Sequence, residues 1–407
     1  MFLWIYILVL SLSVCILFSI IIRGLYYLYF KFPYRLKPQF IKKNKEDKDK
    51  LPSISVFVPC KGMWPELKDN IKAMLNQDYP DYKLFFITES KDDPASSITD
   101  LNLTDKNDIF HHVVAGYADS CCQKNYNLLK GIDYAKNNNL AGEIYVFADA
   151  DIRPPDNWLR NMILPLVDES IFVVSGFRSL VPDKNGFSEQ AHSAFSALQC
   201  MAMTDNLYGA VWGGSMAFRR KVFEQYDIYK TWASAIVDDL SVTSVVKKHK
   251  LKRVFFSDCL AGSSESFSKT GKVLAWFIRQ NQYAAAYLRF YTLLGIFLNI
   301  IIISGILMLP ISIILAFSGI GSWVFAGFHT AFYFLVSTGF SLLSFFRKQK
   351  GYEPIWFLYA PCFLMLGLYC ALVGFFSRRM TWSGTVYHFD NRGNVIRMER
   401  KDPVPTA

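Results

Sequence analysis

The sequence predicts an α/β domain that lies between transmembrane helices, and three observations predict it. Expected strands and helices alternate between residues 52 and 265, which is typical of a sheet built from βαβ units. Four apolar stretches outside this region are each long enough to span a bilayer. The composition agrees, because 52% of the 407 residues are hydrophobic and only 19% are charged.

Residues 1–30 form the expected N-terminal transmembrane anchor. The stretch 2–22 carries no charged side chain and is long enough to cross the hydrocarbon core. It lacks the basic start and the small-residue cleavage site of a removed signal peptide. Arg23 and Lys31 follow it, so the positive-inside rule predicts that the N-terminus faces outward and that the following domain is cytosolic.

Residues 51–265 form the expected α/β domain, after a charged linker over residues 42–50. Apolar runs predict strands at 53–58, 83–88, 144–148 and 171–176. The segments between and around them predict helices at 66–76, 120–136 and 157–167. Because helices separate the strands, we expect a parallel sheet.

The C-terminal third predicts a membrane region, residues 291–376, with spans at 292–317, 323–345 and 354–376. Before it, residues 266–290 combine aromatic and spaced basic side chains, which favours a helix on the membrane surface over an ordinary domain helix. Residues 377–407 form a tail. Three crossings would leave this tail outside, yet both 347–350 and 378–379 are basic, so one segment is expected to be re-entrant or to lie along the interface.

The charge and the cysteines narrow the functional classes. The net charge of +10 is concentrated near the apolar segments, which suits anionic lipid headgroups and argues against a nucleic-acid partner. The eight cysteines are scattered without a CxxC pair, which is typical of reduced thiols on the cytosolic side. The six histidines show no metal-ligand spacing.

Asp149 and Asp151 are the most informative pair in the chain. They follow an apolar strand at an i, i+2 spacing, so both side chains can point the same way where the strand ends. Ligands of open α/β sheets bind at that edge. Two carboxylates there can hold a hard divalent cation, Mg²⁺ or Mn²⁺, and the cation can neutralise a diphosphate. The alternative for the pair is a solvated turn.

Asp92 and Asp93 follow the second strand and precede a proline. Carboxylates at that position can accept hydrogen bonds from the ribose and base of a nucleotide. The alternative is a capped turn. Lys61 stands where the first strand ends, and a lysine there can meet a phosphate.

Two further motifs lie later in the domain. Trp212, Gly213 and Gly214 form a glycine turn behind an aromatic face that suits a sugar or a lipid, and the glycines permit positive φ and close ligand approach. The alternative is a plain strand turn. Asp238 and Asp239 open a predicted helix, where capping is one interpretation and a general base, Asp239, is the other.

Together these motifs resemble those of family 2-type inverting glycosyltransferases and, within them, the ceramide glucosyltransferase family, family 21. Residues 59–95 carry much of the resemblance, and it extends over about 50–290 and the membrane layout. It implies a GT-A-like sheet domain that binds a nucleotide-sugar. The family's three aspartates would be Asp93 and Asp149 for the donor and Asp239 as the base. Lys124 and Asn127 fit the family's Lys-x-x-Asn-Leu segment and would also bind the donor.

The turn at Trp212, Gly213 and Gly214 fits the family's acceptor side, with Asp238 placed there too. The family closes its catalytic domain with (Gln/Arg)-x-x-Arg-Trp, which here reads Arg279, Gln282 and Tyr283, so one arginine and the tryptophan of the donor-binding motif are replaced. The stretch 381–389, TWSGTVYHF, resembles the family's segment after its last span and favours a cytosolic C-terminus.

The expected function is that of a multi-pass, membrane-bound inverting glycosyltransferase with a cytosolic catalytic domain. It would move a hexose, glucose by this resemblance, from a UDP-sugar to a lipid hydroxyl of ceramide, a ceramide-like lipid or a hopanoid. Two alternatives stay open: a polysaccharide-extending synthase, and a non-catalytic membrane scaffold that binds a nucleotide-sugar. A transporter is disfavoured because the apolar spans carry almost no ionisable residues.

Overall fold

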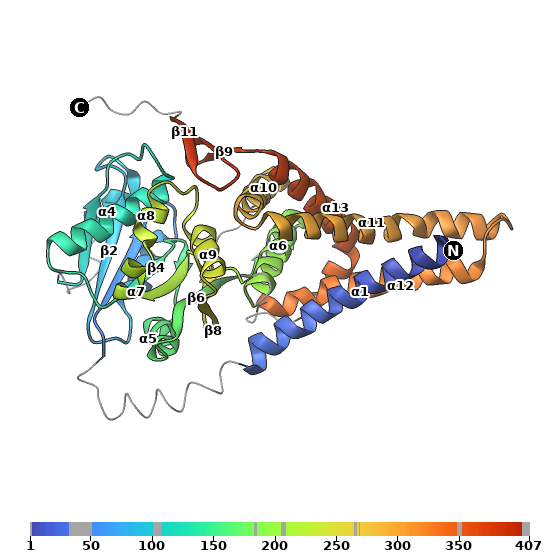
Figure 1. Cartoon of the computed structure of the whole chain (residues 1–407), viewed down its shortest axis with the longest axis horizontal. Coiled ribbons are helices and arrows are strands. Elements are labelled where there is room, and N and C mark those ends of the chain that lie inside the picture. The colour runs from blue at the N-terminus through green and yellow to red at the C-terminus, as the bar shows by residue number, and fades with distance from the viewer. Residues whose placement is uncertain are drawn as a thin grey trace. The chain divides into compact units, whose positions relative to one another are not determined.

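The structure is a computed structural model that describes residues 2–31, 51–100, 108–182, 185–204, 209–263, 267, 269–347 and 352–400 (Figure 1). The chain divides into two compact units. The helical unit comprises Met1–Tyr27, Leu180–Tyr208 and Ser266–Phe376, and the sheet unit comprises Leu28–Ser179, Gly209–Glu265 and Ser377–Ala407. Each unit is described by itself.

An eight-stranded sheet forms the centre of the sheet unit, in the order β3-β2-β1-β4-β7-β6-β8-β5. The strands are β1 (Ile54–Pro59), β2 (Tyr82–Thr88), β3 (Phe110–Val114), β4 (Ile144–Ala148), β5 (Ile152–Arg153), β6 (Ile171–Leu180), β7 (Ser215–Arg219) and β8 (Lys252–Ser263). The four strands β3-β2-β1-β4 are parallel. The predicted parallel arrangement is confirmed for the predicted strands β1, β2 and β4, but the sheet as a whole is mixed, because β7 runs antiparallel to both β4 and β6.

Alternating side chains place a separate apolar cluster on each face of this sheet. Val56 and Val58 of β1 face the helices α3 (Leu67–Leu75) and α5 (Trp158–Ile163). Phe57, between them, faces the other cluster. The helices of that second face are α4 (Gln123–Asn137), α7 (Arg220–Gln225), α8 (Ile228–Trp232) and α9 (Asp238–Lys248).

Most predicted elements of this domain are present, with small shifts at their ends. The helix expected at 120–136 begins at Gln123, because Cys122 caps it by accepting a hydrogen bond from the Asn125 amide. The helix expected at 157–167 is α5 followed by a 3₁₀ turn, η4 (Leu164–Val167), which contains Pro165. A second 3₁₀ segment, η3 (Pro94–Asp100), follows β2.

The helical unit contains the long apolar helices. They are α1 (Phe2–Tyr26), which continues into η1 (Tyr27–Lys31), α11 (Arg289–Phe317), α12 (Trp323–Leu342), which continues into η5 (Leu343–Arg347), and α13 (Ile355–Phe376). Within the described residues, four helices are long and apolar enough to cross a membrane, in agreement with the predicted spans. In Figure 1, α1, α11 and α12 run beside one another.

Two further helices complete this unit. They are α6 (Phe187–Thr204) and α10 (Thr270–Tyr287). The helix expected within 266–290 is therefore present as α10. Its residues Val273, Trp276 and Phe277 are buried, and the helix contacts α13, α11 and α6. Its predicted position on a membrane surface stays a prediction.

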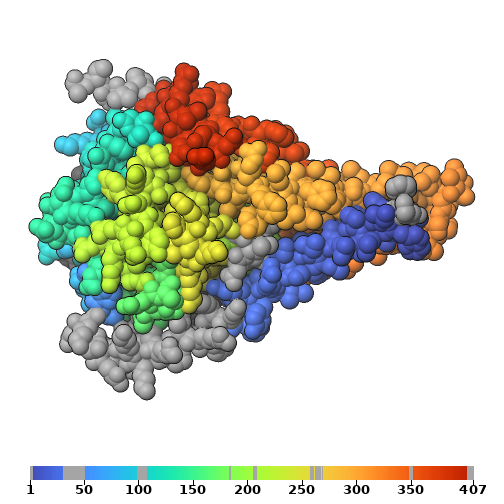
Figure 2. Space-filling model, in the orientation of Figure 1, coloured from blue at the N-terminus to red at the C-terminus, as the bar shows by residue number. Residues whose placement is uncertain are grey.

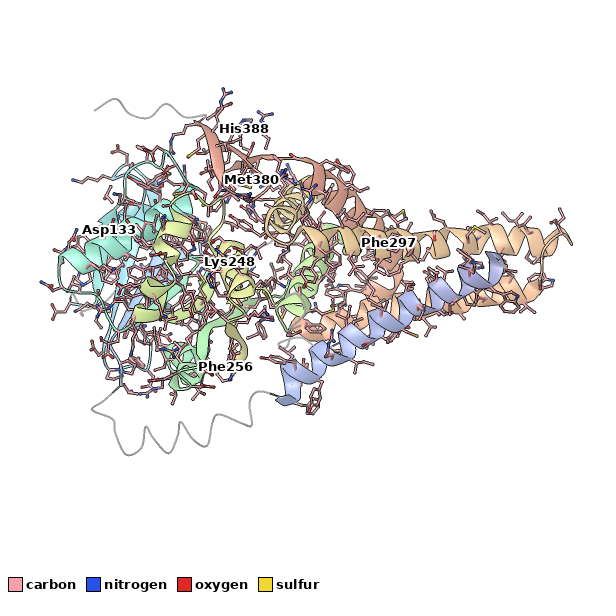
Figure 3. All side chains as sticks on the ribbon, in the orientation of Figure 1. Asp133, Lys248, Phe256, Phe297, Met380 and His388 are labelled. Carbon is pink, nitrogen blue, oxygen red and sulfur yellow. The ribbon has the colours of Figure 1, made fainter. Side chains whose placement is uncertain are left out.

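The residues expected as a C-terminal tail form a second, three-stranded antiparallel sheet, β9 (Arg379–Trp382), β10 (Thr385–Phe389) and β11 (Val395–Arg400). Met380 and His388, labelled in Figure 3, lie on β9 and β10. This sheet belongs to the sheet unit, and Figure 2 shows its red residues against the blue-green residues of the β3–α4 region. The predicted domain boundaries themselves stay predictions.

Candidate active site

The candidate residues that follow the strands of the sheet unit gather at one edge of the large sheet. Parallel strands end at the same edge, so the residues that follow β1, β2 and β4 come together there. Because β7 is antiparallel to β4, its beginning lies beside the end of β4, and Ala148 pairs with Ser215. The Asp149 amide accordingly donates to the Gly214 carbonyl at 3.2 Å. The antiparallel strand thus brings the glycine turn to the aspartate pair.

Asp93 ties the ends of β1 and β2 together. Its Oδ1 accepts hydrogen bonds from the amides of Gly62 and Ala95, each at 2.8 Å. Gly62 has a φ of 76°, a left-handed conformation that favours glycine. Asp93 is buried, whereas Asp92 is exposed on the turn. The turn-capping interpretation therefore describes Asp93 in this structure, and its donor-binding role stays a prediction.

Lys61 forms an ion pair with Glu89, whose Oε1 lies 2.6 Å from the lysine Nζ. Glu89 directly follows β2 and is buried, and its second oxygen, Oε2, has no hydrogen-bond partner among the described residues. The sequence reading missed Glu89, although its place at a strand end was a usable signal. The Lys61 side chain is 36% exposed, so a phosphate could reach it. The positive charge of Lys61 is already paired with the Glu89 carboxylate.

Lys124, in the first turn of α4, joins the aspartates of two other elements. Its Nζ lies 2.7 Å from Asp149 Oδ1 and 3.1 Å from Asp238 Oδ2. Burial alone would lower the pKa of Lys124, but the carboxylates of Asp149, Asp238 and Asp239 together raise it well above its ordinary value. Lys124 therefore stays charged and holds the end of β4 against the start of α9.

Asp239 differs from its neighbour Asp238 in exposure. Asp238 is only 1% exposed, whereas Asp239 is partly accessible. Asp239 accepts hydrogen bonds from the amides of Gly213 at 3.2 Å and Leu240 at 2.6 Å. Desolvation, followed by the nearby Asp238 carboxylate, raises the pKa of Asp239 to about 7. A carboxylate with this pKa can take up a proton near neutral pH.

Neighbouring side chains approach the two glycines of the turn so closely that neither position has room for a Cβ atom. Neither Gly213 nor Gly214 has positive φ, so that part of the expectation is wrong. A Cβ on Gly213 would overlap the Asp238 carboxylate, and one on Gly214 would overlap the Trp212 ring and lie 2.6 Å from Asp149 Oδ2. The absence of side chains at both positions leaves the room that the two aspartates occupy.

A comparison with protein families identifies the family of the chain. Residues 16–395 match the sequence model described as Glycosyl transferase family 21. The chain belongs to this family. The predicted resemblance is confirmed, and so is the fold class, an α/β GT-A-like sheet domain accompanied by long apolar helices. As a family 21 glycosyltransferase, the protein transfers a sugar from a nucleotide-sugar donor.

Solved structures of other glycosyltransferases resemble the chain at low identity. One is the mannosyltransferase PcManGT from Pyrobaculum calidifontis in complex with GDP-Man and Mn²⁺, with a TM-score of 0.44 and 18% identity over 91% of this chain and 98% of that one. Another is glucosyl-3-phosphoglycerate synthase from Mycobacterium tuberculosis in complex with Mn²⁺, UDP-Glc and phosphoglyceric acid, with a TM-score of 0.39 and 14% identity over 64% and 85% of the two chains.

The residues proposed for the metal are compatible with a hard divalent cation. Asp149 and Asp151 follow β4 and have partly exposed side chains. Each forms an ion pair: Asp149 with Lys124, and Asp151 with Arg178, where Asp151 Oδ2 lies 2.8 Å from Arg178 Nη1. No group of three His, Cys, Asp or Glu residues suited to a metal occurs in the described part of the chain. Two carboxylates completed by phosphate oxygens and water are a typical Mg²⁺ set.

Asn127 and Asp238 are buried, so neither faces solvent in this structure. Asn127 Oδ1 accepts a hydrogen bond from Gln123 Nε2 at 2.8 Å, one turn earlier on α4. The sequence reading missed Gln123 and Arg178, because nothing in the local pattern marks a residue whose partners lie far away in the chain. The donor-side role of Asn127 and the acceptor-side role of Asp238 stay predictions.

Arg279, Gln282 and Tyr283 lie on α10, in the helical unit. Gln282 and Tyr283 are buried, and Gly374 of α13 approaches the α10 backbone so closely that a Cβ on it would lie 2.9 Å from the Gln282 amide nitrogen. The donor-binding role of these three residues stays a prediction.

Proposed function

We propose that this family 21 enzyme is a membrane-bound inverting glycosyltransferase that moves a hexose, with glucose as the first candidate, from a UDP-sugar to the hydroxyl of a ceramide, ceramide-like or hopanoid lipid. The observation that carries the proposal is the cluster of Lys124, Asp149, Asp238 and Asp239 at the ligand-binding edge of the sheet. The four apolar helices of the same chain favour an acceptor that resides in the membrane.

The donor would bind across the ends of β1, β2 and β4. Asp93 is already fixed by the Gly62 and Ala95 amides, and its remaining oxygen would accept a hydrogen bond from the nucleoside. Lys61 would exchange its contact with Glu89 for one with a phosphate. Binding energy gained here orients the sugar for a single displacement.

Asp149 and Asp151 would hold the divalent cation. When bound, that cation would neutralise charge on the diphosphate. Lys124 adds a fixed positive charge beside Asp149, since it is partly buried and stays protonated. A protonated lysine at this place favours the negative charge of the departing group.

Asp239 would act as the general base. An alcohol is a poor nucleophile until a positioned carboxylate takes its proton, and a base with a pKa near the working pH does so best. The Gly213 and Leu240 amides hold Asp239 in place, while its partial exposure leaves room for the acceptor hydroxyl. One base acting in one displacement inverts the configuration of the sugar.

The chain connectivity favours a cytosolic C-terminus on the same side as the catalytic sheet. Strand β8 before the membrane region and strands β9–β11 after it belong to one compact unit, so the chain between them crosses the membrane an even number of times. Of α11, α12 and α13, we therefore propose that α13 does not cross. Basic residues precede and follow it in the sequence, at 347–350 and 378–379.

The exposed side of α13 supports this placement. Its exposed large side chains are three, four or seven residues apart and so share one stripe, and all are apolar or aromatic: Leu358, Met365, Tyr369, Leu372 and Phe376. A helix with one such stripe can lie in the headgroup region with that stripe toward the acyl chains. A protease-cleavable tag placed after Ala407 should resist protease in intact cells and be cleaved after permeabilisation; cleavage in intact cells would contradict the topology.

The experiment that tests the proposed function is transfer from a panel of labelled UDP-sugars into extractable lipid by membranes that contain the full chain. The expected result is one labelled lipid that disappears on addition of EDTA. Label in an insoluble polymer would favour the polysaccharide synthase. Nucleotide-sugar binding without any transfer would favour the scaffold.

A further inference from the structure

The C-terminal sheet is attached to the backbone that carries the proposed base. The Val395 amide donates to the Ser234 carbonyl at 2.8 Å, and the Ile236 amide donates to the Gly393 carbonyl at 2.9 Å. Ser234 Oγ also donates to Asn394 Oδ1 at 3.1 Å. These bonds fix the segment that immediately precedes α9 and therefore Asp239.

The same sheet holds the beginning of α4. The Gln123 amide, which has no partner within the helix because it lies in the first turn, donates to the Tyr387 hydroxyl at 3.2 Å. Arg400 Nη2 donates to Gln123 Oε1 at 2.8 Å and to the Ala118 carbonyl at 2.9 Å. Its guanidinium also lies 4.8 Å from the centre of the Tyr117 ring. Lys124 is the next residue along α4.

The two attachments are joined to each other. The Ala235 carbonyl accepts hydrogen bonds from the Cys122 amide at 3.1 Å and from Asn125 Nδ2 at 3.2 Å. The start of α4, the segment before α9 and the C-terminal sheet therefore form a closed ring of hydrogen bonds. The ion pair of Lys124 and Asp238 links the same two helix starts inside the site.

Gln123 extends this ring toward the end of β3. Its Oε1 accepts from the Ala118 amide at 3.0 Å, and its Nε2 donates to the Gly116 carbonyl at 2.8 Å. The Gly116 amide in turn donates to the Glu89 carbonyl at 3.1 Å, next to the donor-side edge. Arg400 is the charged member of this network from the C-terminal sheet, and a hydrogen bond from a charged donor is stronger than one between neutral groups.

We propose that the C-terminal sheet is a working part of the active site and that Arg400 is a positioning residue, which sets the distance between Lys124 and Asp239 by holding the starts of α4 and α9 together. This inference rests on the proposed function. Loss of Arg400 removes the hydrogen bonds of the sheet to the Gln123 side chain and to the Ala118 carbonyl, and the Tyr387 hydroxyl then holds Gln123 through its amide alone. A displacement of about 1 Å at a reacting group is enough to slow catalysis by about 10²-fold.

The test compares Arg400→Gln with a matched control on the same strand, Arg397→Gln, in the full chain. The Arg397 side chain is 71% exposed and faces Glu399, so its loss leaves the ring intact. We expect Arg400→Gln to lower kcat for transfer about tenfold, with the KM for the donor changed less than about threefold and the same thermal unfolding temperature as the control. Arg400→Lys, which keeps the charge but loses the planar guanidinium beside the Tyr117 ring, should recover part of kcat.

Hydrogen exchange gives a second readout that does not depend on transfer. In Arg400→Gln, the amides of Gln123 and Ile236 should exchange faster than in Arg397→Gln. Equal kcat and equal exchange in the two variants would overturn the inference while the proposed function stands. A loss of kcat that is matched by an equal loss of thermal stability would also overturn it. If the wild-type chain transfers no sugar to lipid, the proposed function fails, and the exchange comparison alone decides the inference.

Discussion

Adding one methyl group at Gly214 tests whether the glycine turn keeps the aspartate site in place. A Cβ at this position would lie 2.6 Å from Asp149 Oδ2 and closer still to the Trp212 ring. An ordinary contact begins near 3.4 Å, so the carboxylate has to move by about 0.8 Å and the Trp212 ring by about 1.1 Å. Such overpacking costs about 1–3 kcal/mol of stability, and a shift of about this size lowers the rate by up to about 10²-fold.

The assay is steady-state transfer from UDP-sugar to lipid, together with thermal unfolding, for Gly214→Ala and a control, Gly271→Ala. A Cβ on Gly271 would meet none of the described residues within 4 Å, so the control should behave as wild type. We expect kcat for Gly214→Ala to fall by at least about tenfold. If Gly214→Ala keeps wild-type kcat, the account of the turn is wrong.

Three further predictions concern the charged groups. Because the base must be deprotonated, kcat/KM should fall about tenfold per pH unit below the pKa of Asp239, which is raised to about 7, and level off above it; a pH profile that is flat down to about pH 5 would contradict this. Lys124→Met should lower the free energy of unfolding by about 3 kcal/mol, measured by denaturant titration, and adding Asp238→Asn should restore part of this loss. If Lys124→Met has the same free energy of unfolding as wild type, the ion pair between Lys124 and Asp238 does not stabilise the fold. Asp151→Asn should weaken the apparent affinity for Mn²⁺ or Mg²⁺ in the transfer assay by at least about tenfold, and an unchanged metal titration would remove Asp151 from the metal site.

The parts of the fold that local sequence patterns determine were predictable. Strand β4 has the bounds that its apolar run predicts, 144–148, and the four long apolar helices are where hydropathy places them. The direction of β7 was not predictable, because strand direction depends on how the chain returns to the sheet and not on the composition of the strand. The C-terminal sheet was missed for a related reason, since its short strands are stabilised by contacts with residues more than a hundred positions away.

In the candidate site too, residues marked by local sequence patterns were predicted, and residues that depend on distant contacts were not. Asp149 and Asp239 were identified because each stands at the end of a strand or the start of a helix, where the sequence itself signals a ligand edge. Lys124 was found only through the family resemblance. Arg178 was missed because its importance comes from an ion pair with Asp151 that only the folded chain forms. Glu89 stands at a strand end, which was a usable signal, but its ion pair with Lys61 also appears only in the folded chain.

The most direct test of the central claim is lipid glycosylation by wild type and Asp239→Asn, side by side, in membranes with a labelled UDP-sugar and with or without EDTA. The asparagine keeps the shape of the side chain and one acceptor oxygen, which can serve only one of the Gly213 and Leu240 amides, and it cannot take a proton. The account predicts metal-dependent labelling of a lipid by wild type and a rate about 10²–10⁴-fold lower in the variant. Labelling by Asp239→Asn at a rate near that of wild type would contradict it.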